Sequence, residues 1–166
     1  MTELTPRFRW PLLAAGQAQK ELYHNEALTA IEVLVQPVAE SLGDNDPPTS
    51  PTLGRSWIVG SAPTGAWTGQ AGAVASWTAG GWRFTVPVDG MAFWIADESL
   101  WAQRESGSWQ LGVVSAASLA IDGNQVVGSR EAAIADPVGG ATTDAAARSA
   151  IAAILAALRS HGLIAS

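Results

Sequence analysis

The sequence predicts an α+β fold, with an N-terminal helix, a small Trp-rich antiparallel sheet or barrel, and a short C-terminal helix at an oligomer interface. Three observations support this class. An Ala-, Leu- and Glu-rich periodic zone spans residues 12–42, short alternating runs broken by glycine and proline fill residues 54–114, and a second Ala-rich periodic zone closes the chain. We therefore divide the chain into an N-terminal helical docking segment (1–46), a Trp-rich β domain (52–115), and a hairpin with an oligomerisation helix (116–166).

The N-terminal zone predicts one long amphipathic helix. Its apolar residues recur at spacings of three to five: Leu22, Ala27, Ile31, Leu34 and Val38. We expect this face to pack against another surface. Asn25 could cap a second helical segment, and Pro37 should kink or end the helix. The next stretch, "GDNDPPTSP" at residues 43–51, has the composition of a linker, which places a boundary there.

The middle zone contains a weak internal repeat. Its similar segments are "GRSWIVG" with "GMAFWIAD" (54–60 and 90–97) and "VASWTAGGWRF" with "WAQRESGSWQL" (74–84 and 101–111). Each half predicts one strand followed by a tight hairpin, and Trp82 aligns with Trp109. Two such units make a small antiparallel sheet or barrel.

Eight tryptophans raise the question of which are core and which are exposed. Trp57 and Trp94, in the repeated strands, are the expected core. Trp67 lies in a Gly-rich loop, where exposure is expected. Trp77 and Trp82 flank the Gly-Gly turn, and their odd separation predicts that one points inward and the other outward.

An exposed indole on a rigid sheet can stack on a sugar ring or contact another protein. The candidate carbohydrate-binding residues are Trp67, Trp77 and Trp82. The alternative is that every tryptophan is core packing, because large aromatic side chains are highly buried on average.

The last zone predicts a hairpin through Asp122-Gly123, then a helix capped by Thr143 or Asp144 and stopped by Gly162, with Leu163 folding back onto the last turn. Ala147 begins an apolar stripe close to heptad spacing. The candidate oligomer-interface residues on this stripe are Ile151, Ile154, Leu155 and Leu158. Such a stripe permits a trimer without selecting it.

Composition and charge exclude several classes of protein. Fifteen acidic against nine basic residues give a net charge of −6, which disfavours nucleic acid as a partner. The absence of cysteine removes disulfides and thiolate chemistry. The longest apolar run, Ala150–Leu158, is far short of the roughly 20 residues of a spanning helix, and the first residues do not resemble a signal peptide. We expect a soluble, non-secreted product with no membrane insertion, or one released by lysis.

The residues that could carry catalysis form no recognisable constellation. His24 and His161 sit in predicted helices, and no nucleophile elbow, zinc-binding helix motif or phosphate-binding loop is present. Asp97, Glu98 and Glu105 do not form an acid–base pair by spacing. We expect no catalytic residue, no metal, no cofactor and no enzymatic activity, and a glycan hydrolase is the weakest alternative.

Three stretches resemble an uncharacterised domain family of bacterial prophages and gene transfer agents, encoded with tail fibre, head spike and host-adhesion proteins. They are "LLAAGQAQK", "HNEAL" and the "GAWTG…W…GGW" run, within a resemblance that covers about residues 5–112. The tail from "VVGSREAAIADPVGG" onward is similar to the closing segment of many phage spike and fibre proteins. Some family members are much longer, with additional receptor-binding regions.

This resemblance implies a virion structural protein of a phage-like particle, a component of a tail fibre or spike used in host adhesion. It implies a homo-oligomer, a trimer in most fibres, that docks to other virion proteins through its N-terminal region. Such a protein is assembled in the bacterial cytoplasm and released by lysis. The alternative is a carbohydrate-binding module that recognises host capsule or surface polysaccharide.

Overall fold

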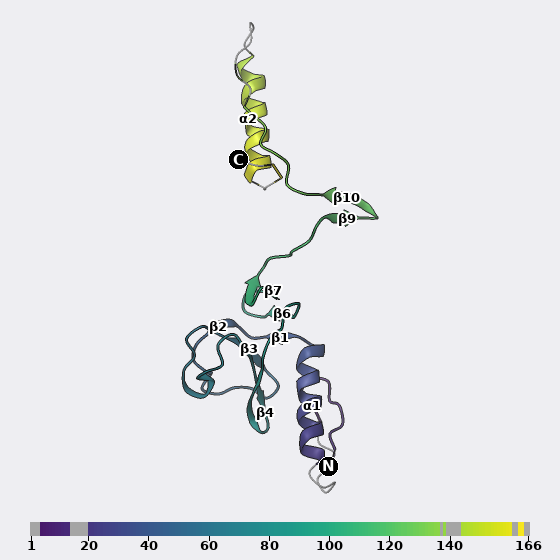
Figure 1. Ribbon diagram of the computed structural model, residues 1–166, viewed down its shortest axis with the longest axis vertical. Helices are drawn as coiled ribbons and strands as arrows, with labels where there is room; N and C mark the ends of the chain where they lie inside the picture. Colours follow the sequence, from purple (N-terminus) through teal and green to yellow (C-terminus); the bar gives the residue numbers. More distant parts are fainter. Residues whose placement is uncertain (1–3, 14–19, 137, 139–143, 161–162, 165–166) are drawn as a thin grey trace. The chain divides into compact units, whose positions relative to one another are not determined.

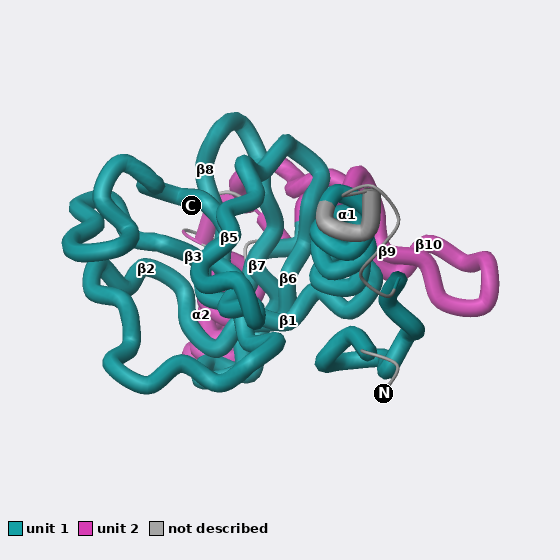
Figure 2. The backbone as a smooth tube through the Cα atoms, turned by 90° about the horizontal axis from the view of Figure 1, so that it is seen from below, with its two compact units in different colours: residues 1–114 teal, residues 115–166 magenta. Residues whose placement is uncertain are grey.

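The computed structural model describes the chain in five stretches: residues 4–13, 20–136, 138, 144–160 and 163–164. The chain forms two compact units, Met1–Val114 (unit 1) and Ser115–Ser166 (unit 2), which Figures 1 and 2 show. Unit 1 contains an N-terminal helix and two small sheets, and unit 2 contains a two-stranded hairpin and a C-terminal helix. The α+β class is confirmed, and no closed barrel occurs within the stretches given above.

Helix α1 runs over Lys20–Val35 and ends before Pro37, as predicted. The face that it buries differs from the prediction. Glu32 and Val33 are buried, whereas the predicted apolar stripe is exposed at Ala27, Ile31 and Leu34. Helix α1 therefore packs onto the rest of unit 1 through the side that carries Glu32 and Val33, and the predicted apolar stripe is open to solvent.

Asn25 does not begin a second helical segment, because α1 continues through it. Its side chain instead binds the backbone of the N-terminal arm: the amide oxygen accepts from Leu13 N at 2.9 Å, and the amide nitrogen donates to Leu13 O at 3.1 Å. The capping residue expected from sequence thus joins two segments that are distant along the chain.

The two sheets of unit 1 share one topology. The first has the order β2-β3-β4-β5 (Leu42–Asp44, Ser56–Val59, Val74–Thr78, Gly81–Thr85), and the second has the order β1-β6-β7-β8 (Val38–Ala39, Ala92–Ile95, Leu100–Glu105, Ser108–Leu111). In each sheet a short edge strand pairs parallel to its neighbour, and the remaining pairs are antiparallel. The sequence repeat is therefore a repeat of strand order.

The hairpin register overturns one prediction. Trp77 lies directly opposite Trp82 across β4 and β5, so both indoles stand on the same face of the sheet. The prediction of opposite faces was wrong because a two-residue turn joins the paired residues Thr78 and Gly81.

A shared core lies between the sheets and α1. It contains Val33 from the helix, Ile58 and Val74 from the first sheet, and Phe93 and Ile95 from the second. Each sheet therefore turns one face toward this core and one face away from it.

Both expected core tryptophans lie on outer faces. Trp57 is buried, as predicted, but in a separate cluster on the outer face of the first sheet. Trp94 is only half-buried on the outer face of the second sheet, and its neighbour Phe93 takes the core position. Trp109 packs on Phe93 with ring centroids 5.9 Å apart, so it does not share the environment of Trp82, its partner in the sequence repeat.

Unit 2 contains β9 and β10 (Leu119–Ile121 and Asn124–Val127) and α2 (Ala145–Ser160). Asp122 and Gly123 form the predicted turn with φ of 49° and 77°. Asp144 caps α2, since its Oδ1 accepts from Ala147 N at 2.9 Å. Leu163 N donates to the carbonyl of the last helical turn at 3.0 Å. The predicted roles of Thr143, His161 and Gly162 lie outside the described residues.

Candidate functional site

The outer face of the first sheet carries a tryptophan cluster made of Trp57, Trp67, Trp77 and Trp82. The ring centroids of Trp67 and Trp82 are 5.3 Å apart, and those of Trp77 and Trp82 are 5.0 Å apart, both edge-to-face. Edge-to-face contacts of this kind add to the stabilisation from burial alone. The cluster is therefore first of all a second hydrophobic core.

Trp67 is the lid of this cluster, and the prediction that it is exposed was wrong. Its side chain is 0% exposed in the short 3-10 helix η1, Gly65–Trp67. Thr64 holds the loop in place: its backbone nitrogen donates to Asn45 O at 2.8 Å, and its hydroxyl donates to Asp46. The glycines that suggested an open loop instead form its tight turns, because Gly65, Gly69 and Gly72 have φ of 53°, 81° and 72°. Close backbone approach occurs just before this loop, where a Cβ on Gly60 would lie 2.2 Å from a backbone carbonyl oxygen.

Of the three candidate carbohydrate-binding residues, Trp67 offers no ring face to a ligand, because reaching it requires the loop to open. Trp77 and Trp82 are half-buried, and each contacts the other. Among the described residues Trp67 Nε1 is also a buried nitrogen with no hydrogen-bond acceptor. An unpaired buried donor is costly, so the apolar contacts of this ring must outweigh it.

The outer face of the second sheet has a different character. Trp94 and Trp101 are directly paired across β6 and β7, with ring centroids 5.7 Å apart, and Trp101 is 50% exposed. Gln103 and Gln110 form the cross-strand pair between β7 and β8 on the same face. We call these four residues the indole–amide face.

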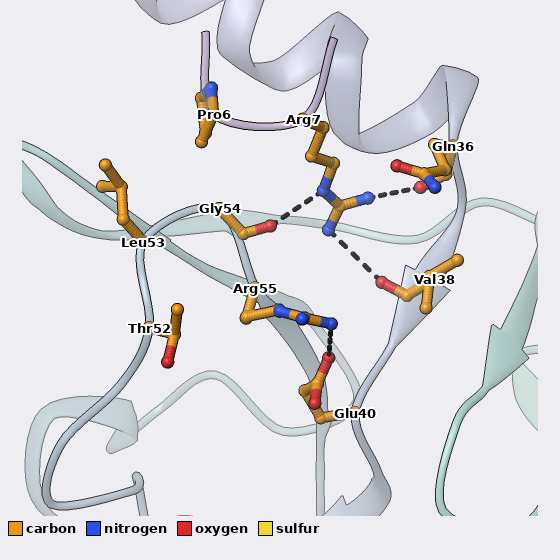
Figure 3. A pocket seen from close by; sticks show the side chains of 9 residues that line it. All are labelled: Pro6, Arg7, Gln36, Val38, Glu40, Thr52, Leu53, Gly54 and Arg55. Atoms are coloured by element: carbon orange, nitrogen blue, oxygen red, sulfur yellow. Dashed lines mark hydrogen bonds and ion pairs between the residues drawn. The ribbon is translucent and has the colours of Figure 1, made fainter. Parts of the chain in front are cut away.

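A pocket of about 340 Å³ lies between the N-terminal arm, the end of α1 and residues 52–55 (Figure 3). Arg7 forms its inner wall. The guanidinium donates to Gly54 O at 2.8 Å, to Ser56 Oγ at 2.7 Å, and to the carbonyls of Gln36 and Val38. Burial lowers the pKa of Arg7, and the nearby Glu32 carboxylate opposes that shift.

The donors of Arg7 are thus already used within the protein. The other cation of this pocket, Arg55, is paired with Glu40 at 2.9 Å. The pocket therefore fastens the N-terminal arm to the sheet and offers no unpaired cation to an anionic ligand.

Glu32 completes this anchor from the helix side. Its Oε1 accepts from the Thr5 hydroxyl, from Arg7 N at 3.0 Å and from the backbone N–H of Phe8. A buried carboxylate is stable when backbone donors satisfy it in this way. The N-terminal arm consequently belongs to the structure of unit 1.

Unit 2 leaves most of its apolar side chains exposed. Among its described residues only Leu155 and Ile164 are buried apolar side chains. The exposed ones include Leu119, Ile121, Val126, Val127, Ile134, Ile151 and Ile154. Polar contacts within the unit include Arg159 with Asp136 at 3.0 Å and Arg130 Nε with Ile164 O at 3.2 Å.

The candidate interface residues of α2 fall into two groups. Ile151 and Ile154 are 44% and 60% exposed, and Leu158 is half-buried. Leu155 is only 5% exposed within the single chain. The heptad positions therefore face outward, while Leu155 packs inside the unit.

The titratable residues that the sequence offered as catalytic candidates lie apart from one another on the surface. His24 lies on the exposed side of α1, and Asp97, Glu98 and Glu105 are exposed at the ends of β6 and β7. Across the described stretches no three His, Asp or Glu residues gather as a metal site would require. In the same stretches, no helix combines the length and the apolarity that crossing a membrane demands.

Unit 1 is thus an α+β domain of two mixed sheets with a tryptophan cluster on one outer face. Its sequence matches DUF2793, a family described as a protein of unknown function, over residues 24–110. The match covers just over half of the chain, so the protein belongs to this family. It runs from α1 through β8, which shows that the family domain contains both sheets. A comparison with curated proteins finds no match.

Proposed function

We propose that this protein is a homo-oligomeric structural component of a phage-like particle, in a tail fibre or head spike, without enzymatic activity. The observation that carries the proposal is the composition of the unit 2 surface. A small unit whose described residues bury two apolar side chains gains little from the hydrophobic effect, whereas ordering its chain costs roughly 1–2 kcal/mol per residue for the backbone. An isolated two-stranded hairpin and an isolated short helix are each marginal in water.

Copies of the same chain are the partners that the α2 seam fits. Ala147, Ile151, Ile154 and Leu158 follow spacings of four, three and four, which is the a/d pattern of a coiled coil. Isoleucine at both an a and a d position favours three or four strands over two. The exposure of Ile151 and Ile154 therefore supports self-association about α2, with Leu155 assigned to packing within each protomer. The choice of a trimer comes from the resemblance to fibre proteins.

The N-terminal helix offers a second contact surface. The exposed stripe of α1 runs through Tyr23, Ala27, Ile31 and Leu34 at helical spacing. Since the buried side of α1 already packs on unit 1, this stripe is available to another protein. We assign it to docking on a further virion protein, in line with the resemblance of the N-terminal region to particle-associated domains.

Sedimentation of the full chain tests the oligomeric part of the proposal. The wild type should sediment at the mass of a trimer at micromolar concentration. The double variant Ile151→Asp/Ile154→Asp should be monomeric, with association weakened at least ~100-fold, because each protomer would bring two charges into the seam. The matched control Ala153→Asp/Ala156→Asp, on the same helix but off the seam, should remain trimeric. A monomeric wild type would refute self-assembly.

Particle association tests the structural role separately. Particles released by lysis of the producing bacterium should contain the protein, together with virion proteins made in the cytoplasm. Ile31→Asp should remove it from purified particles while leaving its sedimentation unchanged. An oligomer that is absent from particles would leave self-assembly in place and reject the virion role.

A further inference from the structure

The two sheets of unit 1 differ in what covers their outer faces. In the first sheet the connection between β3 and β4, residues 60–73, folds back and places Trp67 over the tryptophan cluster. In the second sheet the connection between β6 and β7, residues 96–99, is a short turn. The shared strand order thus gives two outer faces, and only the first is closed by a lid of its own chain.

The uncovered face carries an aromatic side chain where exposure is costly. Trp101 is half exposed, and Trp94 supports its ring edge-to-face. Both stand on a sheet whose opposite side is fixed by Phe93, Ile95 and Ala102 in the shared core. The indole is therefore held on a rigid surface, which lowers the entropic cost of binding a ligand.

Beside this indole lie two uncharged amides. Gln103 and Gln110 are half-buried neighbours across β7 and β8, and neither side chain has a hydrogen-bond partner among the described residues. A glutamine amide offers two N–H donors and an oxygen acceptor. Arg104 points to the other side of the strand, where its guanidinium lies 5.7 Å from the centroid of the Trp109 ring. Glu105 follows Gln103 on the same side of β7 and is exposed at the end of the hairpin. The indole–amide face thus combines an indole and two amides with a carboxylate at its edge, and that carboxylate favours a neutral ligand over an anionic one.

These properties match a saccharide. A pyranose ring has an apolar C–H face that can lie on an indole, and edge hydroxyls that both donate and accept hydrogen bonds. A nucleic acid would require cations for its phosphates, and the protein has a net charge of −6. A protein partner would favour a larger apolar centre than one exposed ring flanked by unpaired amides.

We propose that the indole–amide face is a binding site for a neutral saccharide, with one pyranose ring stacked on Trp101 and its hydroxyls bonded to Gln103 and Gln110. The site is distinct from the tryptophan cluster and does not depend on the assembly role. A single ring of this kind binds weakly. In an oligomer the same face would be repeated, and avidity would strengthen binding to a polysaccharide.

Saturation-transfer NMR with the full chain tests the site. The probes are methyl glycosides of glucose, galactose, mannose and N-acetylglucosamine. At least one should bind with millimolar affinity, Trp101→Ala should weaken that affinity at least tenfold, and Gln103→Ala should weaken it several-fold. Tyr23→Ala, which removes an even more exposed aromatic ring from α1 (73% against 50% for Trp101), is the control and should bind like the wild type.

Several results would overturn the assignment. No transfer to any of the four probes, or transfer that persists in Trp101→Ala, would reject the site. If Trp101→Ala proves poorly folded, Trp101→Phe replaces it, and unchanged binding in both this variant and Gln103→Ala would also reject the site. A change of sedimenting mass in Trp101→Ala would identify the face as a contact between copies instead. Because the probes are monosaccharides, a negative result leaves the trimer unaffected.

Discussion

Replacing Trp67 by alanine should produce the largest loss of stability of any single tryptophan substitution in unit 1. The side chain is 0% exposed and lies between Trp57 and Trp82, at centroid distances of 6.5 and 5.3 Å. Truncating a buried aromatic side chain to alanine costs about 3–5 kcal/mol, because transfer energy is lost and a cavity remains. For a domain of this size the melting temperature should fall by at least ~12 °C.

Trp67→Phe separates the two opposing contributions of this ring. Phenylalanine fills less of the site, which should cost about 1–2 kcal/mol by analogy with other large-to-small core changes. It also removes the unpaired Nε1–H, whose burial costs about 1–3 kcal/mol. The two effects should nearly cancel, so Trp67→Phe should lie within about 1 kcal/mol of the wild type.

Urea unfolding followed by circular dichroism measures both variants. Trp101→Ala, at the half-exposed ring, is the control and should cost clearly less than Trp67→Ala. A free energy of unfolding for Trp67→Ala within 1 kcal/mol of the wild type would refute burial of this loop residue. A loss in Trp67→Phe of more than about 2 kcal/mol, beyond the cost of the missing ring volume, would show that the indole nitrogen has an acceptor.

Three further predictions concern a buried acid, a tightly packed glycine and an exposed ion pair of unit 1. Glu32→Ala should release the N-terminal arm and speed proteolytic cleavage there. Glu32→Gln keeps an acceptor oxygen, so its arm should be cleaved more slowly than that of Glu32→Ala. Equal cleavage rates in the two variants would contradict the role of Glu32 as an anchor. Gly60→Ala should abolish soluble expression, because its Cβ would lie 2.2 Å from a carbonyl oxygen. The control Gly107→Ala has open space around the Cβ but a φ of 74°, so it should lower the free energy of unfolding by about 1 kcal/mol, measured by thermal melting. Arg83→Ala should change stability by less than about 1 kcal/mol, since the ion pair that it breaks is exposed; a larger loss on urea unfolding would contradict that interpretation.

Local chemistry predicted the elements with local causes. Pro37 ended the first helix, Asp122-Gly123 made the hairpin of unit 2, and Asp144 capped the last helix. These features depend on backbone angles and on hydrogen bonds between neighbouring residues, and both follow from the residue types at those positions. The repeated strand pattern was also visible, and it appeared as two sheets with the same strand order.

The environment of each tryptophan could not be predicted in the same way. Trp67 looked exposed because glycines surround it, yet those glycines have positive φ and turn the loop back, so that Trp67 is buried against the sheet. Trp94 looked like core, yet Phe93 took that position, since a shift of one residue exchanges the two faces of a strand. Only the register then brings Trp101 beside Trp94 and leaves both uncovered.

The sequence by itself determined the α+β class, the end of α1, the cap of α2, the tight turns and the apolar stripes of both helices, because these follow from residue types at short spacing. The tertiary structure decided which stripe α1 buries, which side of each strand faces the shared core, and which tryptophans close over one another. The physical reason is that burial depends on contacts between residues far apart in the chain. Glu32 shows this best: this acid lies off the apolar stripe of α1, and it is buried because the backbone N–H groups of Arg7 and Phe8, from a distant segment, bind its carboxylate.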